Sequence, residues 1–156
     1  QENPGEEKMS TTTLNPVLQV RRVFEATPEE LFDAWFTREQ WQAWIGPEGC
    51  QCDVPLLEAW KGGRYRIRMH LRDGHEIPVD KANKNVTHHH HLVFSWGWAL
   101  AGGSTTVRLS FKPVAGGTEL TLTHEGLPTA QDREGHGKGW NSALNKLARF
   151  VKGETP

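Results

Sequence analysis

The sequence predicts an α+β domain in which a curved antiparallel sheet is closed around a long C-terminal helix. Three observations carry this prediction. Apolar residues recur with a period of two over much of residues 50–127, and glycine-containing turns separate these segments. Residues 129–152 instead have helical periodicity, and no other segment is long enough to cover the sheet. Two short helices are expected between the first strand and the rest of the sheet.

The length of 156 residues is typical of one domain, expected here over residues 14–153, and residues 1–13 read as a disordered tail. The first predicted strand covers residues 17–25. Its alternation places four side chains on one face: Leu18, Val20, Arg22 and Phe24.

The segment Thr27-Pro28-Glu29-Glu30 predicts a helix start, with Thr27 as the cap and Glu30 completing a capping box. A second short helix follows from Thr37 and stops at the Gly46-Pro47-Glu48-Gly49 segment. Beyond it, the alternating segments predict strands joined as a meander. These strands are expected at residues 50–57, 64–71, 92–100, 105–112 and 118–125, with hairpin turns at Asp73-Gly74 and Gly116-Gly117.

The last helix carries one apolar stripe at spacings of four, three and four residues, made by Trp140, Leu144, Leu147 and Val151. Glycines at positions 135, 137 and 139 predict a flexible or kinked approach to this helix. A curved sheet wrapped on a single helix tends to leave space between the two, which is where a ligand would bind.

Composition excludes several classes of protein. A net charge of −1 gives no electrostatic support for nucleic-acid binding, and no run approaches the roughly 20 apolar residues of a membrane span. Cys50 and Cys52 are too close in one strand for an ordinary disulfide, which indicates a reducing, cytoplasmic setting. Glycine pairs lie between strands and not before a helix, so they predict turns and no phosphate or cofactor site.

Five segments in order carry a family resemblance. They are residues 26–35 (ATPEELFDAW), 44–49 (WIGPEG), 62–65 (GGRY), 92–96 (LVFSW) and 117–127 (GTELTLTHEGL), followed by Gly139-Trp140 and its helix. Together they resemble the SRPBCC (START-like) superfamily, in the branch similar to the activator of heat-shock protein 90 ATPase. One stretch, residues 81–91, departs from the pattern because it is polar and histidine-rich where a strand with apolar alternation is expected.

The resemblance implies a helix-grip fold with a mostly hydrophobic cavity, and it leaves the function open. The favoured hypothesis is binding of a hydrophobic or amphipathic small molecule between the sheet and the last helix. The expected cavity walls are Tyr65, Met69, Phe94, Trp96, Trp140 and Leu144. Arg22 shares the inward face of the first strand and is a candidate polar anchor, or else it pairs with a carboxylate such as Glu58 or Glu125.

Two alternatives have weaker support. A cyclase- or hydrolase-type enzyme would need two ionisable side chains in the cavity, and His124 and Glu125 point to opposite faces of a strand. No catalytic residue is therefore assigned, and a structural role is favoured for His124. A co-chaperone-like interaction module would need a recognition surface of its own. Exposed edge strands of such sheets often pair with a second copy of the chain, so a homodimer is a further expectation.

The histidine run is a weak metal candidate. In a strand, His88 and His90 would share one face, and two imidazoles at that spacing can chelate a divalent ion. No third ligand is evident in the sequence, so the favoured interpretation is a solvated or inserted loop that binds nickel or zinc adventitiously, and no metal site is assigned.

Overall fold

Seven strands form one antiparallel sheet in the order β2-β8-β7-β6-β5-β4-β3. The computed structural model describes residues 17–70, 76–97 and 105–156, with residues 76–84 described by their backbone alone. The strands are β2 (Leu18–Phe24), β3 (Gln51–Leu57), β4 (Arg64–His70), β5 (Glu76–Thr87), β6 (His91–Trp96), β7 (Thr105–Val114) and β8 (Gly117–Glu125). Strands β3 to β8 follow one another as a meander, and β2 closes the order by pairing with β8.

Two short helices connect β2 to the meander. Helix α1 (Pro28–Phe36) begins with the predicted capping box, in which the backbone N–H of Glu30 donates to Thr27 Oγ1 at 3.1 Å. The backbone N–H of Thr27 in turn donates to Glu30 Oε1 at 2.9 Å. Helix α2 (Arg38–Trp44) packs against α1, and the indole of Trp44 donates to the carbonyl of Ala34 at 2.9 Å.

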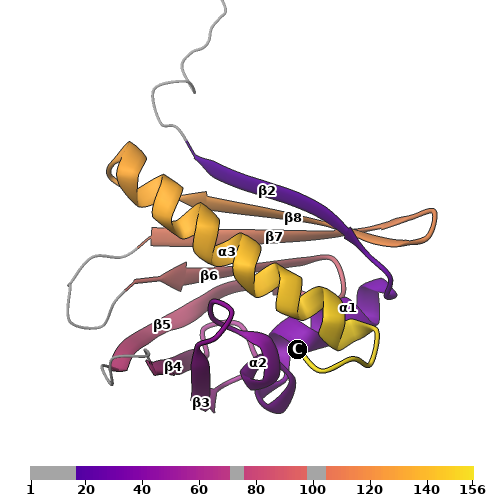
Figure 1. The fold of residues 1–156 in the computed structure, drawn as a ribbon, viewed down its shortest axis with the longest axis horizontal. Helices are drawn as coiled ribbons and strands as arrows, with labels where there is room; N and C mark the ends of the chain where they lie inside the picture. The colour runs from indigo at the N-terminus through magenta and orange to yellow at the C-terminus, as the bar shows by residue number, and fades with distance from the viewer. Residues whose placement is uncertain (1–16, 71–75, 98–104) are drawn as a thin grey trace, which may run out of the picture.

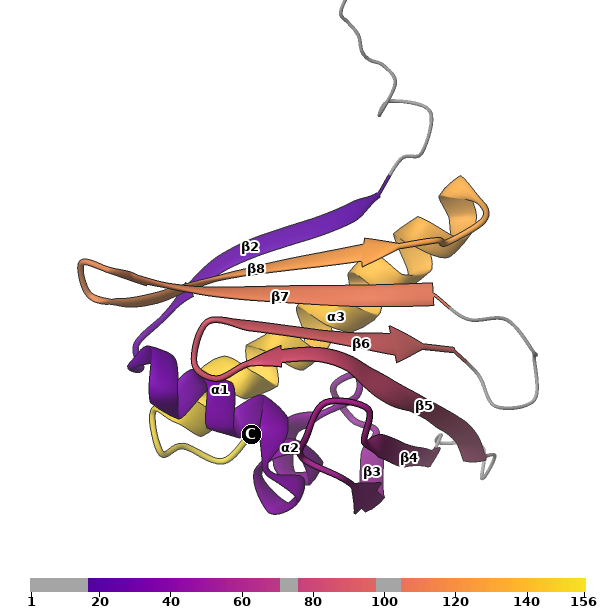
Figure 2. The same ribbon diagram turned by 180° about the vertical axis from the view of Figure 1, so that it is seen from behind.

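Helix α3 (Ala130–Val151) lies diagonally across one face of the sheet, with α1 and α2 beside its C-terminal half (Figure 1). Seen from behind, the strands stand in front of α3 (Figure 2). The stripe of α3 that faces the sheet is buried at Trp140, Ala143, Leu144 and Leu147. The order of elements and the long closing helix confirm the predicted α+β helix-grip fold. Within the part of the chain that the structure describes, no helix is long and apolar enough to span a membrane.

The polar stretch that departs from the family pattern does form a strand. Strand β5 pairs with β4 and β6, and a register shift lies between Asn83 and Asn85. Its pairing depends on backbone groups, so the strand forms without the apolar alternation that would have revealed it. The predicted Asp73-Gly74 turn, residue 71 of the predicted strand 64–71 and residues 98–100 of the predicted strand 92–100 lie outside the described residues.

His88 and His90 are not part of a strand, so their predicted shared face is wrong, although His91 begins β6. Residues 88–90 form the turn between β5 and β6, where the backbone N–H of His90 donates to the carbonyl of Thr87 at 3.0 Å. His89 has a φ of 69°, and the rings of His88 and His89 each lie 5.5 Å from the ring of Phe32. Among the described residues, no group of three or more His, Cys, Asp or Glu side chains could hold a metal ion.

An aromatic core fills the space between the sheet and the helices. Tyr65 is central to it, with its ring 5.3 Å from Trp41 and 5.8 Å from Phe94, both in edge-to-face geometry. The Tyr65 hydroxyl donates to the carbonyl of Ser95 at 2.5 Å, so its one polar group is satisfied. Towards the N-terminal half of α3, this core gives way to open space.

Candidate functional site

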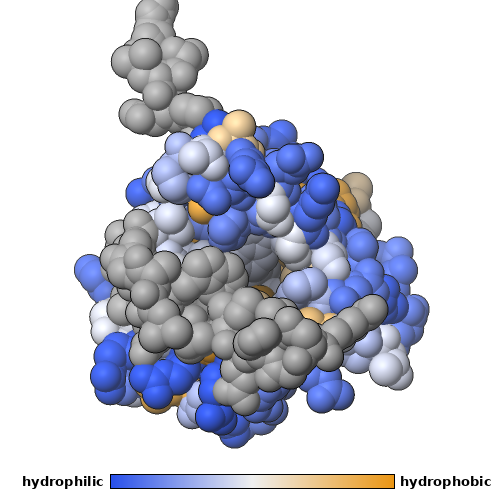
Figure 3. All heavy atoms as spheres, turned by 60° about the vertical axis from the view of Figure 1, so that its left-hand side comes forward, coloured by the Kyte–Doolittle hydropathy of each residue, from blue (hydrophilic) through white to orange (hydrophobic). Residues whose placement is uncertain are grey.

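A cavity of about 350 Å³ lies between the N-terminal half of α3, the loop after α2, and strands β4 and β6. Figure 3, which looks onto the side of the molecule where α3 begins, shows the surface hollowed at its centre. The lining residues come from three parts of the chain: Ile45, Gly46 and Pro47 of the loop; Met69 and Trp96 of the sheet; and Gln131, Asp132, Gly135, His136, Gly139, Trp140 and Ala143 of α3.

Two tryptophans border the cavity. The ring centroids of Trp96 and Trp140 lie 5.0 Å apart at an angle of 50°, so the two indoles pack against each other. Each is only 4% exposed, which means that the rest of each ring is packed in the core. Met69 adds a flexible thioether that can adapt to a guest. The cavity is therefore mostly apolar on its sheet side.

Two glycines leave positions of the α3 wall without side chains. Gly135 and Gly139 both face the cavity, and a Cβ atom added at either position would meet nothing within 4 Å. Gly137 differs, because its added Cβ would lie 3.3 Å from Leu18 Cδ1. All three glycines lie inside α3, which starts at Ala130 with Thr129 as its cap, so the predicted kinked approach before the helix is wrong.

A directional hydrogen-bond network fixes the Trp140 wall from behind. The indole N–H of Trp140 donates to His124 Nδ1 at 3.0 Å, so Nδ1 carries no proton. The proton of the neutral imidazole is then on Nε2, which donates to Thr105 Oγ1 at 2.7 Å. Thr105 Oγ1 donates onward to the carbonyl of Trp96 at 2.8 Å. His124 thus connects the two tryptophan walls through hydrogen bonds.

Burial keeps this imidazole neutral. His124 is fully buried, and removal from water, with a smaller contribution from nearby His136, lowers the pKa of His124 from 6.5 to about 3. Its two ring nitrogens are both occupied by hydrogen bonds to Trp140 and Thr105. The favoured structural role for His124 agrees with this geometry, since the side chain supports the cavity wall and does not line the cavity.

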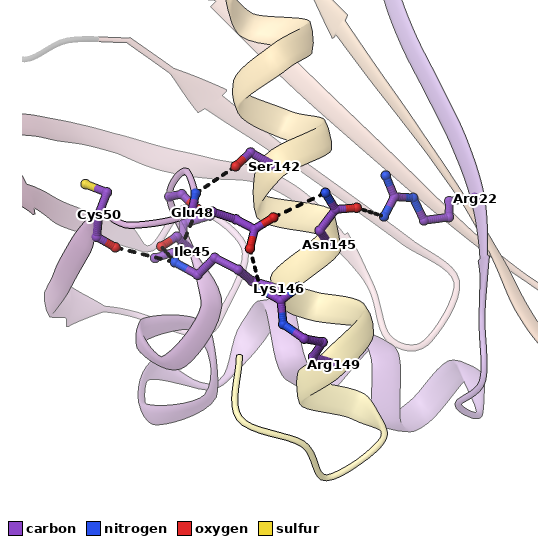
Figure 4. A network of polar contacts seen from close by, with 9 residues as sticks. Arg22, Ile45, Glu48, Cys50, Ser142, Asn145, Lys146 and Arg149 are labelled. Atoms are coloured by element: carbon purple, nitrogen blue, oxygen red, sulfur yellow. Dashed lines mark hydrogen bonds and ion pairs between the residues drawn. The ribbon is translucent and has the colours of Figure 1, made fainter.

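The loop that forms the opposite wall is clamped to α3 (Figure 4). The Lys146 ammonium, 8% exposed, donates to the carbonyls of Ile45, Gly46 and Cys50 at 3.3–3.5 Å. Gly46 has a φ of 90°, and a Cβ there would come within 2.5 Å of Cys52 Sγ, so this tight loop requires glycine.

Glu48 adds a second clamp. Its backbone N–H donates to Ser142 Oγ at 2.7 Å, and its carboxylate accepts from Arg149 at 2.6 Å and Asn145 at 3.4 Å. These hydrogen bonds lower the pKa of the Glu48 carboxyl group. The loop wall of the cavity is therefore held by side chains from residues 142–149 of α3, about two turns of the helix.

Arg22 belongs to this clamp region and does not line the cavity. Its guanidinium donates to Asn145 Oδ1 at 2.8 Å (Figure 4). It also donates to Asn141 Oδ1 at 3.2 Å. Partial burial lowers the pKa of Arg22. The expected carboxylate partners are wrong, because Glu58 pairs with Arg64 and Glu125 with Arg108. The amides are Arg22's partners in place of an ionic group.

The predicted wall residues divide into two layers. Met69, Trp96 and Trp140 line the cavity, while Tyr65, Phe94 and Leu144 are buried in the core. Sequence reasoning missed the lining residues of the loop and of the first turns of α3. The signal was present in the spacing of Asp132, Gly135, His136, Gly139, Trp140 and Ala143, which is that of one helical face.

A second, polar cleft of about 820 Å³ lies on the other side of the clamped loop and includes Cys50 and Cys52. Both thiols are free. Burial, with a smaller contribution from the neighbouring Cys50, raises the pKa of Cys52 to about 12, which makes its thiolate scarce near neutral pH. His70 and Asp53, 2.9 Å apart, also border this cleft.

Comparison with known proteins supports the fold and the family. A profile of the family described as Activator of Hsp90 ATPase homolog 1-like protein matches residues 25–152. A solved protein from Chromobacterium violaceum is 24% identical, with a TM-score of 0.82 over 87% of this chain and 96% of that one. An AHSA1 protein from Silicibacter pomeroyi is 29% identical, with a TM-score of 0.77 over 88% of this chain and 98% of that one.

A third solved protein, from Rhodobacter sphaeroides, is 26% identical with a TM-score of 0.77, over 88% of this chain and 93% of that one. The search of curated proteins found no match. The descriptions of these structures mention no ligand or reaction. The comparisons thus support family and fold, and the cavity must supply the argument for function.

Proposed function

Because the chain belongs to the family of Activator of Hsp90 ATPase homolog 1-like proteins, whose fold suits ligand binding, we propose that it binds a hydrophobic or amphipathic small molecule between the sheet and α3. The proposed site is the cavity lined by Met69, Trp96 and Trp140. Apolar surface with a few polar groups at one side is the usual character of small-molecule sites.

The observation that carries the proposal is the pair of cavity-facing glycines. Glycine within a helix costs about 1 kcal/mol relative to alanine. At Gly135 and Gly139 an alanine would meet no other atom within 4 Å, so packing does not require glycine at either position. Two helix-weakening residues therefore sit where larger side chains would project into the cavity. An open cavity is the physical feature that these glycines preserve.

The size of the cavity limits the ligand. Small-molecule sites span roughly 300–1,000 Å³, and a volume of about 350 Å³ lies at the lower end. It suits one ring system with a short chain better than a lipid with two acyl chains. The lining, which includes Trp96, Trp140 and Met69, favours an apolar group.

Native mass spectrometry of protein purified from its natural host tests this proposal. We expect the wild-type protein to retain a small molecule. Gly139→Leu places a large side chain in the cavity and should abolish retention without unfolding the protein. Lys138→Leu is the matched control, because it adds the same side chain at the adjacent, exposed position of α3. Retention by Gly139→Leu, or no retained molecule in the wild type, would contradict the proposal.

We also propose that the protein works in a reducing, cytoplasmic compartment. Cys50 and Cys52 are both free and half-buried, and a closely spaced thiol pair persists best where disulfides do not form. Cells would be lysed under unfolding conditions in the presence of an alkylating reagent. Mass analysis of the purified chain should then find both thiols alkylated. A population with both thiols protected by oxidation would contradict this location.

A further inference from the structure

The two thiols of the chain lie together in the polar cleft on the far side of the clamped loop. Cys50 and Cys52 both line this cleft of about 820 Å³, and both are free and half-buried. The sequence contains no other cysteine. The Cys52 thiol is within hydrogen-bonding reach of the Cys50 thiol. The two sulfur atoms therefore form a pair that one bound atom can bridge.

The surrounding backbone holds both sulfurs in place. The Cys50 thiol donates to the carbonyl of His70 at 3.2 Å, and the Cys50 carbonyl accepts from Lys146 at 3.5 Å. In Figure 4 this thiol points away from α3. The Cys52 sulfur packs on the backbone of Gly46, where an added Cβ would come within 2.5 Å of it. A guest that binds both sulfurs therefore immobilises little that is not already fixed.

A metal ion is poorly suited to this pair. Metal ions bind thiolates, so each thiol must lose its proton. Burial raises the pKa of Cys52 to about 12, which makes that loss costly near neutral pH. Zinc also takes three or four protein ligands, and the described residues contain no group of three or more His, Cys, Asp or Glu side chains that could hold an ion. The pair suits a guest that binds two neutral thiols and needs no third protein ligand.

Trivalent arsenic has this chemistry, because it is a soft acceptor of the kind that sulfur ligands select. Arsenous acid, As(OH)3, is uncharged near neutral pH and condenses with two thiols. Two As–S bonds form, two As–O bonds break, and the two thiol protons leave with the two hydroxyl groups as water. Arsenic stays trivalent throughout, so the step needs neither an oxidant nor a reductant.

We propose that Cys50 and Cys52 are a binding site for trivalent arsenic, which bridges the two sulfurs and keeps its third substituent in the polar cleft. Neither cysteine lines the cavity between the sheet and α3. The arsenic site is therefore separate from the proposed ligand site, and either can exist without the other.

Isothermal titration calorimetry of arsenous acid into the full, reduced chain tests this site. We expect one equivalent to bind, and intact-protein mass spectrometry should find the mass of one arsenous acid less two waters added. Cys50→Ser and Cys52→Ser should each bind at least about a hundredfold more weakly, because the second As–S bond is then lost. Titrations in two buffers of different ionisation enthalpy should show no proton release, whereas a metal ion would displace a proton from each thiol.

The double variant Cys52→Ser/Ser110→Cys is the matched control. It keeps two thiols in the chain but separates them, since Ser110 belongs to β7 and Cys50 directly precedes β3, with β6, β5 and β4 between these strands. Its affinity for arsenous acid should equal that of Cys52→Ser. An affinity equal to that of the wild type would show that thiol number and not the Cys50–Cys52 pair decides binding, and it would overturn the inference.

A measurement on the wild type alone keeps the test independent of the variants. Arsenous acid should protect both thiols from alkylation in the folded chain, whereas alkylation of either thiol at an unchanged rate would overturn the inference. Release of protons on binding, or tighter binding of Zn²⁺ than of arsenous acid, would also overturn it and assign the pair to a metal ion. Methylarsonous acid, titrated in parallel, distinguishes an organic from an inorganic source of the arsenic by which of the two binds more tightly.

Discussion

Acidification should destabilise this protein through one buried side chain, His124. Its pKa is about 3 in the folded protein against 6.5 for an ordinary histidine. Above about pH 6.5 the imidazole is neutral in both the folded and the unfolded states, so it adds no pH dependence. As the pH falls below that value, the unfolded chain binds a proton that the folded chain does not, and stability falls.

The size of this effect follows from the shift. Each pH unit between the two pKa values lowers the free energy of unfolding by about 1.36 kcal/mol. The free energy of unfolding therefore falls by roughly 2 kcal/mol between about pH 7.5 and about pH 5. The loss continues until the pH approaches 3, where folded His124 is itself protonated. A charged imidazole would also repel the indole N–H of Trp140, which now donates to Nδ1.

Urea unfolding across this pH range measures the effect. The quantity compared is the free energy of unfolding of the wild type minus that of His124→Gln at each pH. Glutamine cannot titrate but can accept from Trp140 or donate to Thr105, which are the two contacts of the imidazole. The stability advantage of the wild type should shrink by about 2 kcal/mol on acidification. His136→Gln, the neighbouring ring 5.1 Å away, is the control and should keep the steep dependence. A difference that stays constant with pH would refute the argument.

Two further predictions concern α3 and its clamp. Gly135→Ala and Gly139→Ala should each raise the free energy of unfolding by about 0.5–1 kcal/mol, because an alanine meets no obstacle there. Gly137→Ala should gain less, since its Cβ would approach Leu18 Cδ1 to 3.3 Å, and equal gains in urea unfolding at all three sites would contradict this packing. Lys146→Met removes the donor shared by three loop carbonyls and should cost about 1–3 kcal/mol. Lys138→Met, at an exposed site on the same helix, should change stability by less than about 0.5 kcal/mol, and similar losses for both would argue against the clamp.

The parts of the fold that depend on local chemistry could be predicted from the sequence. The Thr27–Glu30 capping box forms as predicted, because both partners lie within one turn of the chain. The apolar stripe of α3 is also buried as its spacing indicates at Trp140, Leu144 and Leu147. Both features depend on residues that are close together in the sequence, so the sequence pattern is enough to predict them.

Other features depend on partners distant in the sequence. Strand β5 has a polar sequence and forms because β4 and β6 supply hydrogen bonds on both of its sides. The glycines of α3 read as helix breakers, yet the helix continues through them, since tertiary packing outweighs intrinsic propensity. The hydrogen bond between His124 and Trp140 exists only after β8 and α3 dock. Arg22 likewise found amide partners more than 100 residues away.

The central claim is that the space between α3 and the sheet admits a small apolar molecule. Indole N–H signals in a titration of the protein with phenylbutanol, followed by NMR, test it most directly. Trp96 and Trp140 line the cavity, whereas Trp60 is 59% exposed on the surface and serves as an internal reference. We predict saturable shifts of the Trp96 and Trp140 signals, unchanged Trp60, and no response of the two cavity signals in Gly139→Leu. Equal shifts at all three tryptophans, or shifts that persist in Gly139→Leu, would contradict the claim.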